Sequence, residues 1–308
     1  MKQHLYGIAH AVREAVWGAG IERTFRAGRS VGGDPQYPVD RVAEEAVSAY
    51  IREHGLRVAL YSEDEGLIEF GPRPETLLVV DPIDGTRPAA AGLPLSCVSI
   101  VAAPMSESAV IADVRHALLL ELGTGHSLYV GPDGVLQARG YDHRVPALSG
   151  VTSVETMFWT MEFNGHPARR MTAALGDLID ASASTGGLFT VNSACFSISR
   201  IVTGQLDAYV DIGNRILRDH PATEADFRRV GGGNILHLFP YDIAAAVKIA
   251  EAAGVIITDA YGRSLTSTRL TDLSPLNQRS CVAAATPELH RAIMAGIDWD
   301  AAGVTSPR

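Results

Sequence analysis

The hydrophobic positions at the start of the chain repeat with a helical period. Apolar side chains recur every three or four positions over residues 3–26 and again over residues 39–54, so each stretch presents one apolar face. A cluster of glycine, aspartate and proline at residues 32–35 lies between the two stretches and is typical of a loop. The pattern therefore predicts two amphipathic helices ahead of any strand.

Beyond residue 57 the pattern changes to short apolar runs, which are typical of buried strands. In the first half, turns separate these runs, at residues 58–61, 75–80, 95–103, 109–114, 116–122, 127–130 and 135–138. In the second half they alternate with helical patterns, at residues 156–162, 190–191, 206–212, 255–258 and 281–285. The helices are expected at residues 168–181, 196–203 and 240–253 and from residue 287. We therefore predict an α/β protein, with an α+β domain at residues 1–145 and an α/β domain at residues 146–308.

Composition narrows the class of protein. The 308 residues, 46% of them apolar, suffice for one large core or two moderate ones. A formal net charge of -9 argues against a nucleic-acid or membrane-surface binder, but a phosphorylated substrate is compatible with it if bound cations reverse the local field. No apolar run reaches the length of a membrane span, and the N-terminus begins an amphipathic helix rather than a signal peptide. Cys97, Cys195 and Cys281 are far apart in apolar or small-residue surroundings, which indicates free thiols in a cytoplasmic protein.

The densest chemistry follows the predicted strand at residues 75–80, in the hexapeptide Asp81-Pro82-Ile83-Asp84-Gly85-Thr86. Its two carboxylates can converge on one point, while the proline between them stiffens the backbone. Gly85 lets a ligand approach the main chain closely, and Thr86 adds a hydroxyl group.

Arg87 and Pro88 are typical of the first turn of a helix, where the missing N–H of proline does no harm. Free N–H groups at such a helix start suit an anion, and the two aspartates suit a hard cation. The hexapeptide therefore predicts a metal ion and a phosphate group at one spot, with an ordinary acidic turn as the alternative.

Further acidic residues lie at the ends of predicted elements. Asp40 falls in the first turn of the second helix, where a carboxylate is also an ordinary helix cap. Glu63 belongs to the acidic cluster at residues 62–66, which is typical of a solvated turn but directly follows a predicted strand. Asp242 lies at the start of the helix at 240–253. Since α/β folds place their sites at sheet ends, these acids are candidates for the same site.

The order and context of these motifs resemble the inositol monophosphatase family, within the wider group of metal-dependent, lithium-sensitive sugar and nucleotide phosphatases. The resemblance covers roughly residues 5–295 apart from residues 214–239. The motifs that carry it are Ser62-Glu63-Asp64, the hexapeptide, Tyr241-Asp242-Ile243-Ala244-Ala245-Ala246 and Glu251-Ala252-Ala253-Gly254. It implies a five-layered αβαβα sandwich and, as the usual assembly, a homodimer.

The resemblance also implies roles for individual residues. The implied metal ligands, for two or three Mg2+ ions with Mn2+ as a substitute, are Glu63, Asp81, the carbonyl of Ile83, Asp84 and Asp242. The implied catalytic residues are Asp40, Glu63 and Thr86, of which Asp40 and Thr86 would orient and deprotonate the attacking water. The implied substrate-binding residues are Asp84, Gly85, Thr86, Arg87, Ser193, Ala194 and Asp211, the last meeting a substrate hydroxyl.

Such a site suits phosphate ester hydrolysis. A phosphate monoester is a dianion, which repels an incoming hydroxide until cations neutralise its oxygens. Divalent cations also activate water and stabilise the departing oxygen, so a set of carboxylates that holds them is sufficient. This explains why hard oxygen ligands dominate the motifs and why no histidine or cysteine nucleophile is evident.

The chain departs from the family pattern where the substrate would bind. Arg87 and its successors stand where many members have Thr-Asn-Phe, and Arg87 is either a contact to a second phosphate or acidic group or an ordinary surface arginine. Residues 192–195 are unusual, and Asp211 is shorter than the common glutamate. The insert at residues 214–239 is expected to shape substrate choice and brings in the basic residues Arg215, Arg218, His220, Arg228 and Arg229.

We therefore predict a Mg2+-dependent phosphomonoester hydrolase that acts on a small phosphorylated polyol or sugar, without nucleic-acid or membrane partners. One alternative is a bisphosphate or nucleotide phosphatase acting on fructose 1,6-bisphosphate, 3'-phosphoadenosine 5'-phosphate or a nucleoside phosphate. Another is a sensor that binds a phosphorylated ligand without turnover. The full set of acidic residues argues against the sensor, because an inactive relative is expected to have lost at least one of them. The motifs do not select the physiological substrate, since specificity depends on the departures.

Overall fold

Two helices pack together at the N-terminus, as the periodicity predicts. The computed structural model describes residues 1–19, 28–30, 32–33 and 35–304. Helix α1 spans Lys2–Ala19 and α2 spans Pro38–Glu53, while the end of the predicted helix at residues 3–26 lies outside the described residues. Proline suits the first position of α2, and the carboxylate of Asp40 accepts the backbone N–H of Tyr37 at 2.7 Å.

The first sheet is mostly antiparallel, which confirms the prediction for the first half of the chain. Within the described residues its strand order is β2-β1-β3-β4-β5-β6-β7, and only the pairing of β1 with β3 is parallel. The strands are β1 (Val58–Ser62), β2 (Gly66–Phe70), β3 (Thr76–Asp84), β4 (Cys97–Pro104), β5 (His116–Glu121), β6 (Ser127–Val130) and β7 (Leu136–Arg139).

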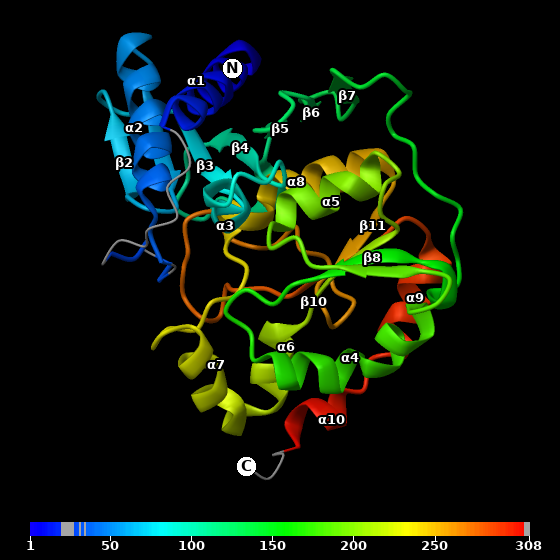
Figure 1. Cartoon of the computed structure of the whole chain (residues 1–308). Helices are drawn as coiled ribbons and strands as arrows, with labels where there is room; N and C mark the ends of the chain where they lie inside the picture. The colour runs from blue at the N-terminus through cyan, green and yellow to red at the C-terminus, as the bar shows by residue number, and fades with distance from the viewer. Residues whose placement is uncertain (20–27, 31, 34, 305–308) are drawn as a thin grey trace.

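Both faces of this sheet are buried. Successive residues of a strand point to opposite faces, and in β3 the side chains of Leu78 and Val80 pack with α1 and α2. Leu77 and Val79 point the other way, into a second apolar cluster. Helices α1 and α2 therefore form an outer layer on one face of the sheet (Figure 1).

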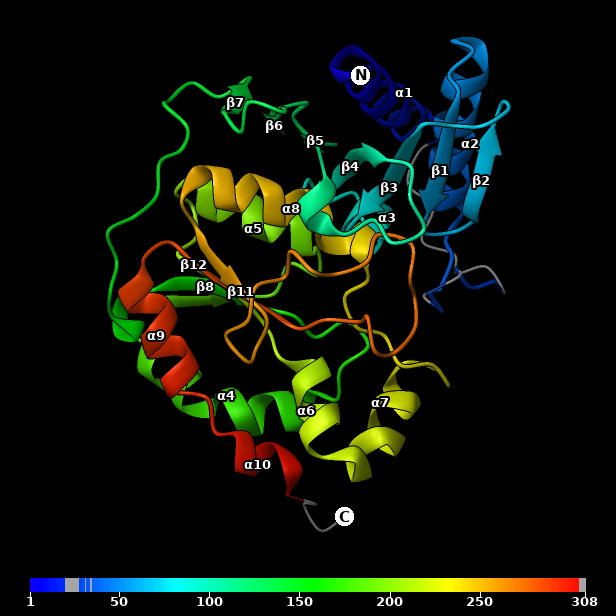
Figure 2. The ribbon, with the colours of Figure 1, turned by 180° about the vertical axis from the view of Figure 1, so that it is seen from behind.

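The second sheet comes from the second half of the chain, in the order β11-β12-β10-β8-β9. Its strands are β8 (Phe158–Met161), β9 (Gly187–Phe189), β10 (Ala208–Asp211), β11 (Ile256–Thr258) and β12 (Cys281–Ala284). Trp159, Val210 and Val282 on its outer face pack with α4 (Ala168–Ser182) and α9 (Pro287–Ala295). The shorter helices on this side are α6 (Gly213–Asp219), α7 (Glu224–Val230) and α10 (Trp299–Gly303), as Figure 2 shows.

Helices α5 (Ala194–Val202) and α8 (Pro240–Ala253) lie between the two sheets (Figures 1 and 2). All of α5 and most of α8 are buried, because a sheet lies on either side of them. They pack with Leu77 and Val79 of the first sheet and with Tyr209 and Ala283 of the second. The five layers of the expected αβαβα sandwich are thus confirmed, whereas the division at residues 1–145 and 146–308 stays a prediction.

Several local elements differ from the sequence prediction. Residues 109–114 are not a strand, because Ile111 and Ala112 donate their N–H groups to carbonyls in the segment 266–268 and a short 3-10 turn forms at Ile111–Asp113. The strand predicted at 190–191 lies earlier, at β9. The pattern missed edge strand β2, where the exposed Leu67 interrupts the apolar alternation.

The insert at residues 214–239 is largely helical and contains most of α6 and all of α7. Cys97, Cys195 and Cys281 are buried free thiols, as predicted. None of the described helices is long and apolar enough to cross a membrane.

Candidate active site

Asp81 and Asp84 lie within a strand rather than just past its end, which corrects the sequence prediction. Strand β3 continues to Asp84, but its pairing with β4 shifts between Asp81, which lies opposite Ser99, and Asp84, which lies opposite Cys97. Pro82 has no N–H to donate to the ladder, and a bulge at this point is the ordinary way to accommodate it. Both carboxylates line the same cleft.

Gly85 makes the turn from β3 into α3 (Thr86–Ala90) in a left-handed conformation, with φ 91° and ψ 47°. A Cβ atom at this position would lie 2.9 Å from Cβ of Ser193 and 3.0 Å from the carbonyl oxygen of Leu95. Only glycine satisfies both the positive φ and this close approach. The turn places Thr86 and Arg87 on the wall of the cleft.

The carboxylate of Asp84 caps the N-terminus of α5. Its Oδ1 accepts the N–H of Ala194 at 3.1 Å, and its Oδ2 accepts the N–H of Phe196 at 3.0 Å and the hydroxyl of Ser193. A negative charge is favourable at a helix N-terminus. Asp84 therefore joins the two halves of the chain, and it holds the predicted substrate residues Ser193 and Ala194 beside the hexapeptide.

Glu63 lies in the tight turn between β1 and β2 and is half-buried, unlike the exposed Glu65. Glu44 of α2 supports this turn, because its Oε1 accepts the N–H of Asp64 at 3.2 Å. Burial raises the pKa of Glu44 to about 8, and its Oε2 has no hydrogen-bond partner among the described residues. The acidic cluster is thus a partly buried turn that α2 holds in place, rather than a fully solvated turn.

One cleft collects nearly all of the predicted site residues. They are Glu63, Asp81, Ile83, Asp84, Gly85, Thr86, Arg87, Ser193, Ala194, Asp211 and Asp242. Asp40 lies beside the cleft, in a narrow recess that Glu63 and Ile83 also line. The structure thus gathers the predicted residues at one place, although their individual roles stay predictions.

Burial and mutual repulsion oppose ionisation of these carboxylates. Burial, followed by the charges of Asp84 and Asp242, raises the pKa of Asp81 well above its ordinary value. Burial also raises the pKa of Asp40 to about 7, although the N–H of Tyr37 and the hydroxyl of Thr86 act in the opposite direction. A cation among these groups would offset the repulsion.

The carboxylate oxygens of the cleft suit a hard divalent cation, although the described side chains do not form a complete coordination site in this structure. Within residues 1–19, 28–30, 32–33 and 35–304, no three His, Cys, Asp or Glu side chains stand close enough together to hold a metal ion as they are. Hydrogen bonds help to keep the carboxylates apart, since Asp84 and Asp242 each accept backbone N–H groups. Among the described residues, Oδ1 of Asp84 accepts only the N–H of Ala194 and keeps a second lone pair. Four carboxylates that line one cleft are the ligands that Mg2+ and Mn2+ prefer.

The cleft also contains a second group of polar residues, most of which sequence reasoning missed. We call it the polar wall; it consists of Glu162, Asn164, His166, Asp211 and His237. Only Asp211 was expected there. Glu162 directly follows β8, so it carries the same strand-end signal as Glu63. His166 and His237 lie in connecting segments, and nothing in the sequence pattern marks them.

The basic residues of the insert do not line the cleft. Each is held by other groups. Three of them form ion pairs: Arg215 with Asp219, Arg228 with Glu224 and Arg229 with Asp226. Arg215 also stacks on Trp299. Arg218 donates to the carbonyl of Leu276, and His220 contacts the carbonyl of Trp299. The insert contributes Leu236, His237 and Leu238 to the cleft instead.

Comparison with known proteins agrees with this geometry. The profile of the inositol monophosphatase family matches residues 5–298. A protein of Archaeoglobus fulgidus named fructose-1,6-bisphosphatase/inositol-1-monophosphatase is 27% identical over 288 residues, which are 92% of each chain. A protein of the same name from Methanothermobacter thermautotrophicus is 24% identical over 268 residues, which are 85% of this chain and 83% of the relative.

Solved structures share the fold at lower identity. The inositol monophosphatase of Thermotoga maritima has a TM-score of 0.64 and 18% identity, with 94% of each chain covered. The extragenic suppressor protein suhB of Bartonella henselae has a TM-score of 0.68 and 16% identity, with 96% of this chain and 97% of that chain covered. Because the family profile matches almost the whole sequence, the chain belongs to the inositol monophosphatase family and is a phosphoric monoester hydrolase.

Proposed function

We propose that this chain is a Mg2+-dependent phosphatase whose substrate is a small phosphorylated polyol or sugar. The observation that carries the proposal is the convergence of Glu63, Asp81, Asp84 and Asp242 on one cleft that also contains Thr86 and Arg87. These four carboxylates come from three separate segments of the chain, and general electrostatics gives no reason to gather them except to hold cations. The names of the relatives from Archaeoglobus fulgidus and Methanothermobacter thermautotrophicus support a phosphorylated sugar or polyol as substrate.

The four carboxylates and the carbonyl of Ile83 would hold two or three Mg2+ ions, with Mn2+ as a substitute. Bound there, such ions neutralise the phosphoryl oxygens, activate water and stabilise the departing oxygen. Asp242 suits this role because the N–H of Phe239 holds its Oδ2 at 2.6 Å, which limits the motion of the carboxylate.

The chain's own groups bind the phosphate and accept the proton. Arg87 and the backbone N–H groups of Gly85 and Thr86 would contact the phosphoryl oxygens. Asp40 would take the proton from the attacking water, since a pKa of about 7 is well matched to a general base near neutral pH. The hydroxyl of Thr86 donates to the carbonyl of Ile83 at 3.2 Å, which fixes the threonine beside Asp40.

The finer expectations from the family stay proposals as well. We propose a homodimer in the cytoplasm, and sedimentation of the purified protein tests the dimer.

Phosphate release over a substrate panel, with Mg2+ and with EDTA, tests the function. The panel contains inositol 1-phosphate, fructose 1,6-bisphosphate, 3'-phosphoadenosine 5'-phosphate, nucleoside monophosphates, several sugar phosphates and p-nitrophenyl phosphate. We expect Mg2+-dependent release from a polyol or sugar phosphate, and loss of that release in Asp81→Asn. Release that persists in EDTA, or no release from any member of the panel by the folded protein with Mg2+, would contradict the proposal.

A further inference from the structure

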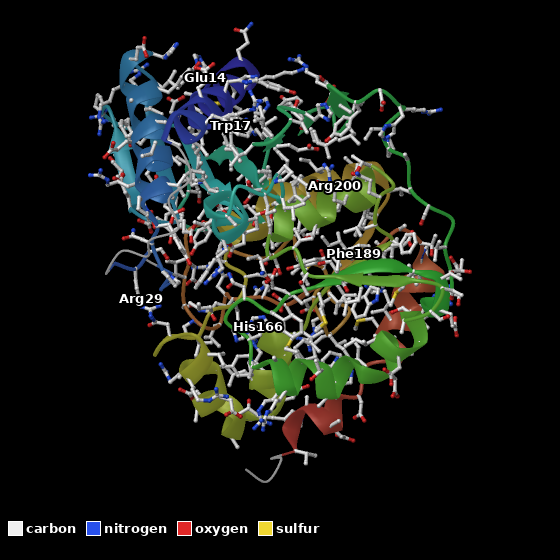
Figure 3. The ribbon with its side chains drawn as sticks, in the orientation of Figure 1. Glu14, Trp17, Arg29, His166, Phe189 and Arg200 are labelled. Atoms are coloured by element: carbon white, nitrogen blue, oxygen red, sulfur yellow. The ribbon has the colours of Figure 1, made fainter. Side chains whose placement is uncertain are left out.

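The polar wall contains ionisable groups that the proposed mechanism does not use. Glu162, His166 and His237 are all buried, and they line the cleft together with Asp211. His166 lies in the connection between β8 and α4, in the middle of the molecule beside α6 (Figure 3). What these groups can bind depends on which of their atoms already have partners.

His166 and Asp211 form a fixed pair. Nε2 of His166 lies 2.9 Å from Oδ1 of Asp211, and both side chains are almost completely buried. Burial opposes a charged imidazole, but the adjacent carboxylates of Asp211 and Glu162 outweigh it and raise the pKa of His166. Oδ1 of Asp211 also accepts the N–H of Gly213 at 3.0 Å, whereas its Oδ2 is buried without a hydrogen-bond partner among the described residues.

His237 comes from the insert and is only 5% exposed. Neither of its ring nitrogens has a hydrogen-bond partner in the described part of the chain. Its ring packs edge-on against His166 and Phe227, each with a centroid distance of 5.3 Å. Burial, followed by the charges of His166 and Arg218, lowers the pKa of His237 well below its ordinary value, so its ring is neutral near pH 7 and offers one donor and one acceptor.

Leaving a buried donor and acceptor without partners is costly, and each such group in a native fold calls for an explanation. An alcohol group both donates and accepts, so it satisfies a neutral imidazole and an adjacent carboxylate oxygen. A phosphate dianion does not, because it has no proton to donate to the carboxylate oxygen of Asp211. Among the described residues of the cleft, Arg87 on the phosphate side is the only arginine or lysine.

We propose that His237, beside the hydroxyl contact already expected of Asp211, binds a further hydroxyl group of the leaving group, and that the chain thereby selects monophosphates of uncharged polyols or sugars over bisphosphates. His166 is a positioning residue that holds Asp211. The inference rests on the proposed function and adds a substrate class to it. It also gives the insert a role, since His237 is the insert residue that brings hydrogen-bonding groups into the cleft.

The experiment compares kcat/KM of His237→Phe and the parent protein on inositol 1-phosphate and on p-nitrophenyl phosphate, whose leaving group has no further hydroxyl. We expect the variant to lose about 10-fold or more on the polyol phosphate relative to p-nitrophenyl phosphate, because one buried hydrogen bond is worth about that factor. His237→Gln retains a donor and an acceptor and should recover part of the loss. Phe227→Leu, which loosens the packing around His237 without removing a polar atom, should leave the ratio of the two substrates unchanged.

The hydroxyl contact would be overturned if His237→Phe lowered kcat/KM equally on both substrates. It would also be overturned if Phe227→Leu lowered kcat/KM on the polyol phosphate alone, as is expected of His237→Phe. For the parent protein we expect a kcat/KM for inositol 1-phosphate about 10-fold above that for fructose 1,6-bisphosphate. The reverse order would overturn the selection against a second phosphate while leaving the phosphatase function intact. No Mg2+-dependent release from any of the three substrates would overturn the proposed function and this inference with it.

Discussion

Asp40 and Asp242 occupy the same position in two helices that lie about 200 residues apart in the sequence. Each is the third residue of its helix, after a proline at the first, and each accepts the backbone N–H of the aromatic residue before that proline. The donor is Tyr37 for Asp40, at 2.7 Å, and Phe239 for Asp242, at 2.6 Å. A capping contact therefore aims both carboxylates at the active-site region, so capping and chemistry use the same side chain.

Because Asp242 is both a helix cap and a proposed metal ligand, the variants Asp242→Asn and Asp242→Ala separate the two roles. Asparagine keeps an oxygen for the N–H of Phe239 but lacks the charge, so we expect activity to fall at least about 100-fold with little change in the free energy of unfolding. Alanine should lose activity similarly and also cost about 1 kcal/mol of stability through the lost cap. Initial rates with Mg2+ and urea unfolding in EDTA measure the two effects. An active Asp242→Asn protein would contradict the assignment of Asp242 as a metal ligand.

Asp84→Asn is expected to affect both activity and stability. Its amide nitrogen cannot accept the N–H of Ala194 or Phe196 at the start of α5, so we expect about 1–2 kcal/mol less stability in addition to a large loss of activity. Ser193→Ala removes only the hydroxyl that donates to Asp84 and keeps the carboxylate, so its activity should fall much less. If Asp84→Asn unfolded at the same urea concentration as the parent, the capping role would be wrong.

Glu44 makes the stability of the metal-free protein dependent on pH. Burial raises its pKa from 4.5 to about 8, so between these pH values the folded state holds a proton that the unfolded state has lost. The contribution of this group to stability is therefore complete at acidic pH and declines as pH rises towards 8. Glu44→Gln keeps an acceptor for Asp64 but cannot ionise, and it should be more stable than the parent at pH 8 by about 1 kcal/mol or more.

At pH 5 the same two proteins should be nearly equally stable, because Glu44 is then protonated in the folded state. Thermal unfolding in EDTA at the two pH values measures the difference, which corresponds to about 2 °C or more at pH 8. A difference of the same size at both pH values would show that ionisation of Glu44 is not its cause.

Arg200 (Figure 3) lies near the C-terminal end of α5, whereas Asp84 caps the N-terminus of this helix. From α5 it pairs with the buried Glu121 at the end of β5, and Glu121 also accepts the hydroxyls of Thr124 and Tyr141. Arg200→Leu leaves a buried carboxylate without its cation and should cost about 3 kcal/mol. The double change Arg200→Leu with Glu121→Leu should recover much of this loss. Activity per folded molecule should change little in both, and a large drop would tie this pair to the active site.

The layers of the fold could be predicted because hydrophobic periodicity is a local signal. The run at residues 75–80 and the helix that ends at Gly254 both appear in the structure close to their predicted places. The strand predicted at residues 109–114 was wrong because an apolar run does not reveal which groups its N–H groups pair with. The N–H of Ile111 donates to the carbonyl of a distant loop residue rather than to a neighbouring strand. Edge strands such as β2 are similarly hard to see, since half of their side chains face water.

For the active site, the acidic motifs were found because strand ends and helix starts place carboxylates in a recognisable context. The cap from Asp84 to α5 was beyond the pattern, since it joins residues 109 or more positions apart. His237 was also beyond it, because only the packed structure shows that its ring nitrogens are buried without partners among the described residues. The partners of the insert's basic residues were beyond the pattern too, because the charge of these residues is visible in the sequence, whereas their carboxylate and carbonyl partners are not.

The middle layer also governs when the active site can exist during synthesis of the chain. Both of its helices begin at the cleft, α5 beside Asp84 and α8 with Asp242 in its first turn. A nascent chain that ends before α8 would contain the whole hexapeptide but lack Asp242, and one that ends before α5 would lack the cap of Asp84. If the carboxylates hold Mg2+ as proposed, the ion should bind late and only to the nearly complete fold, and it should shift the folding equilibrium towards the native state as its concentration rises.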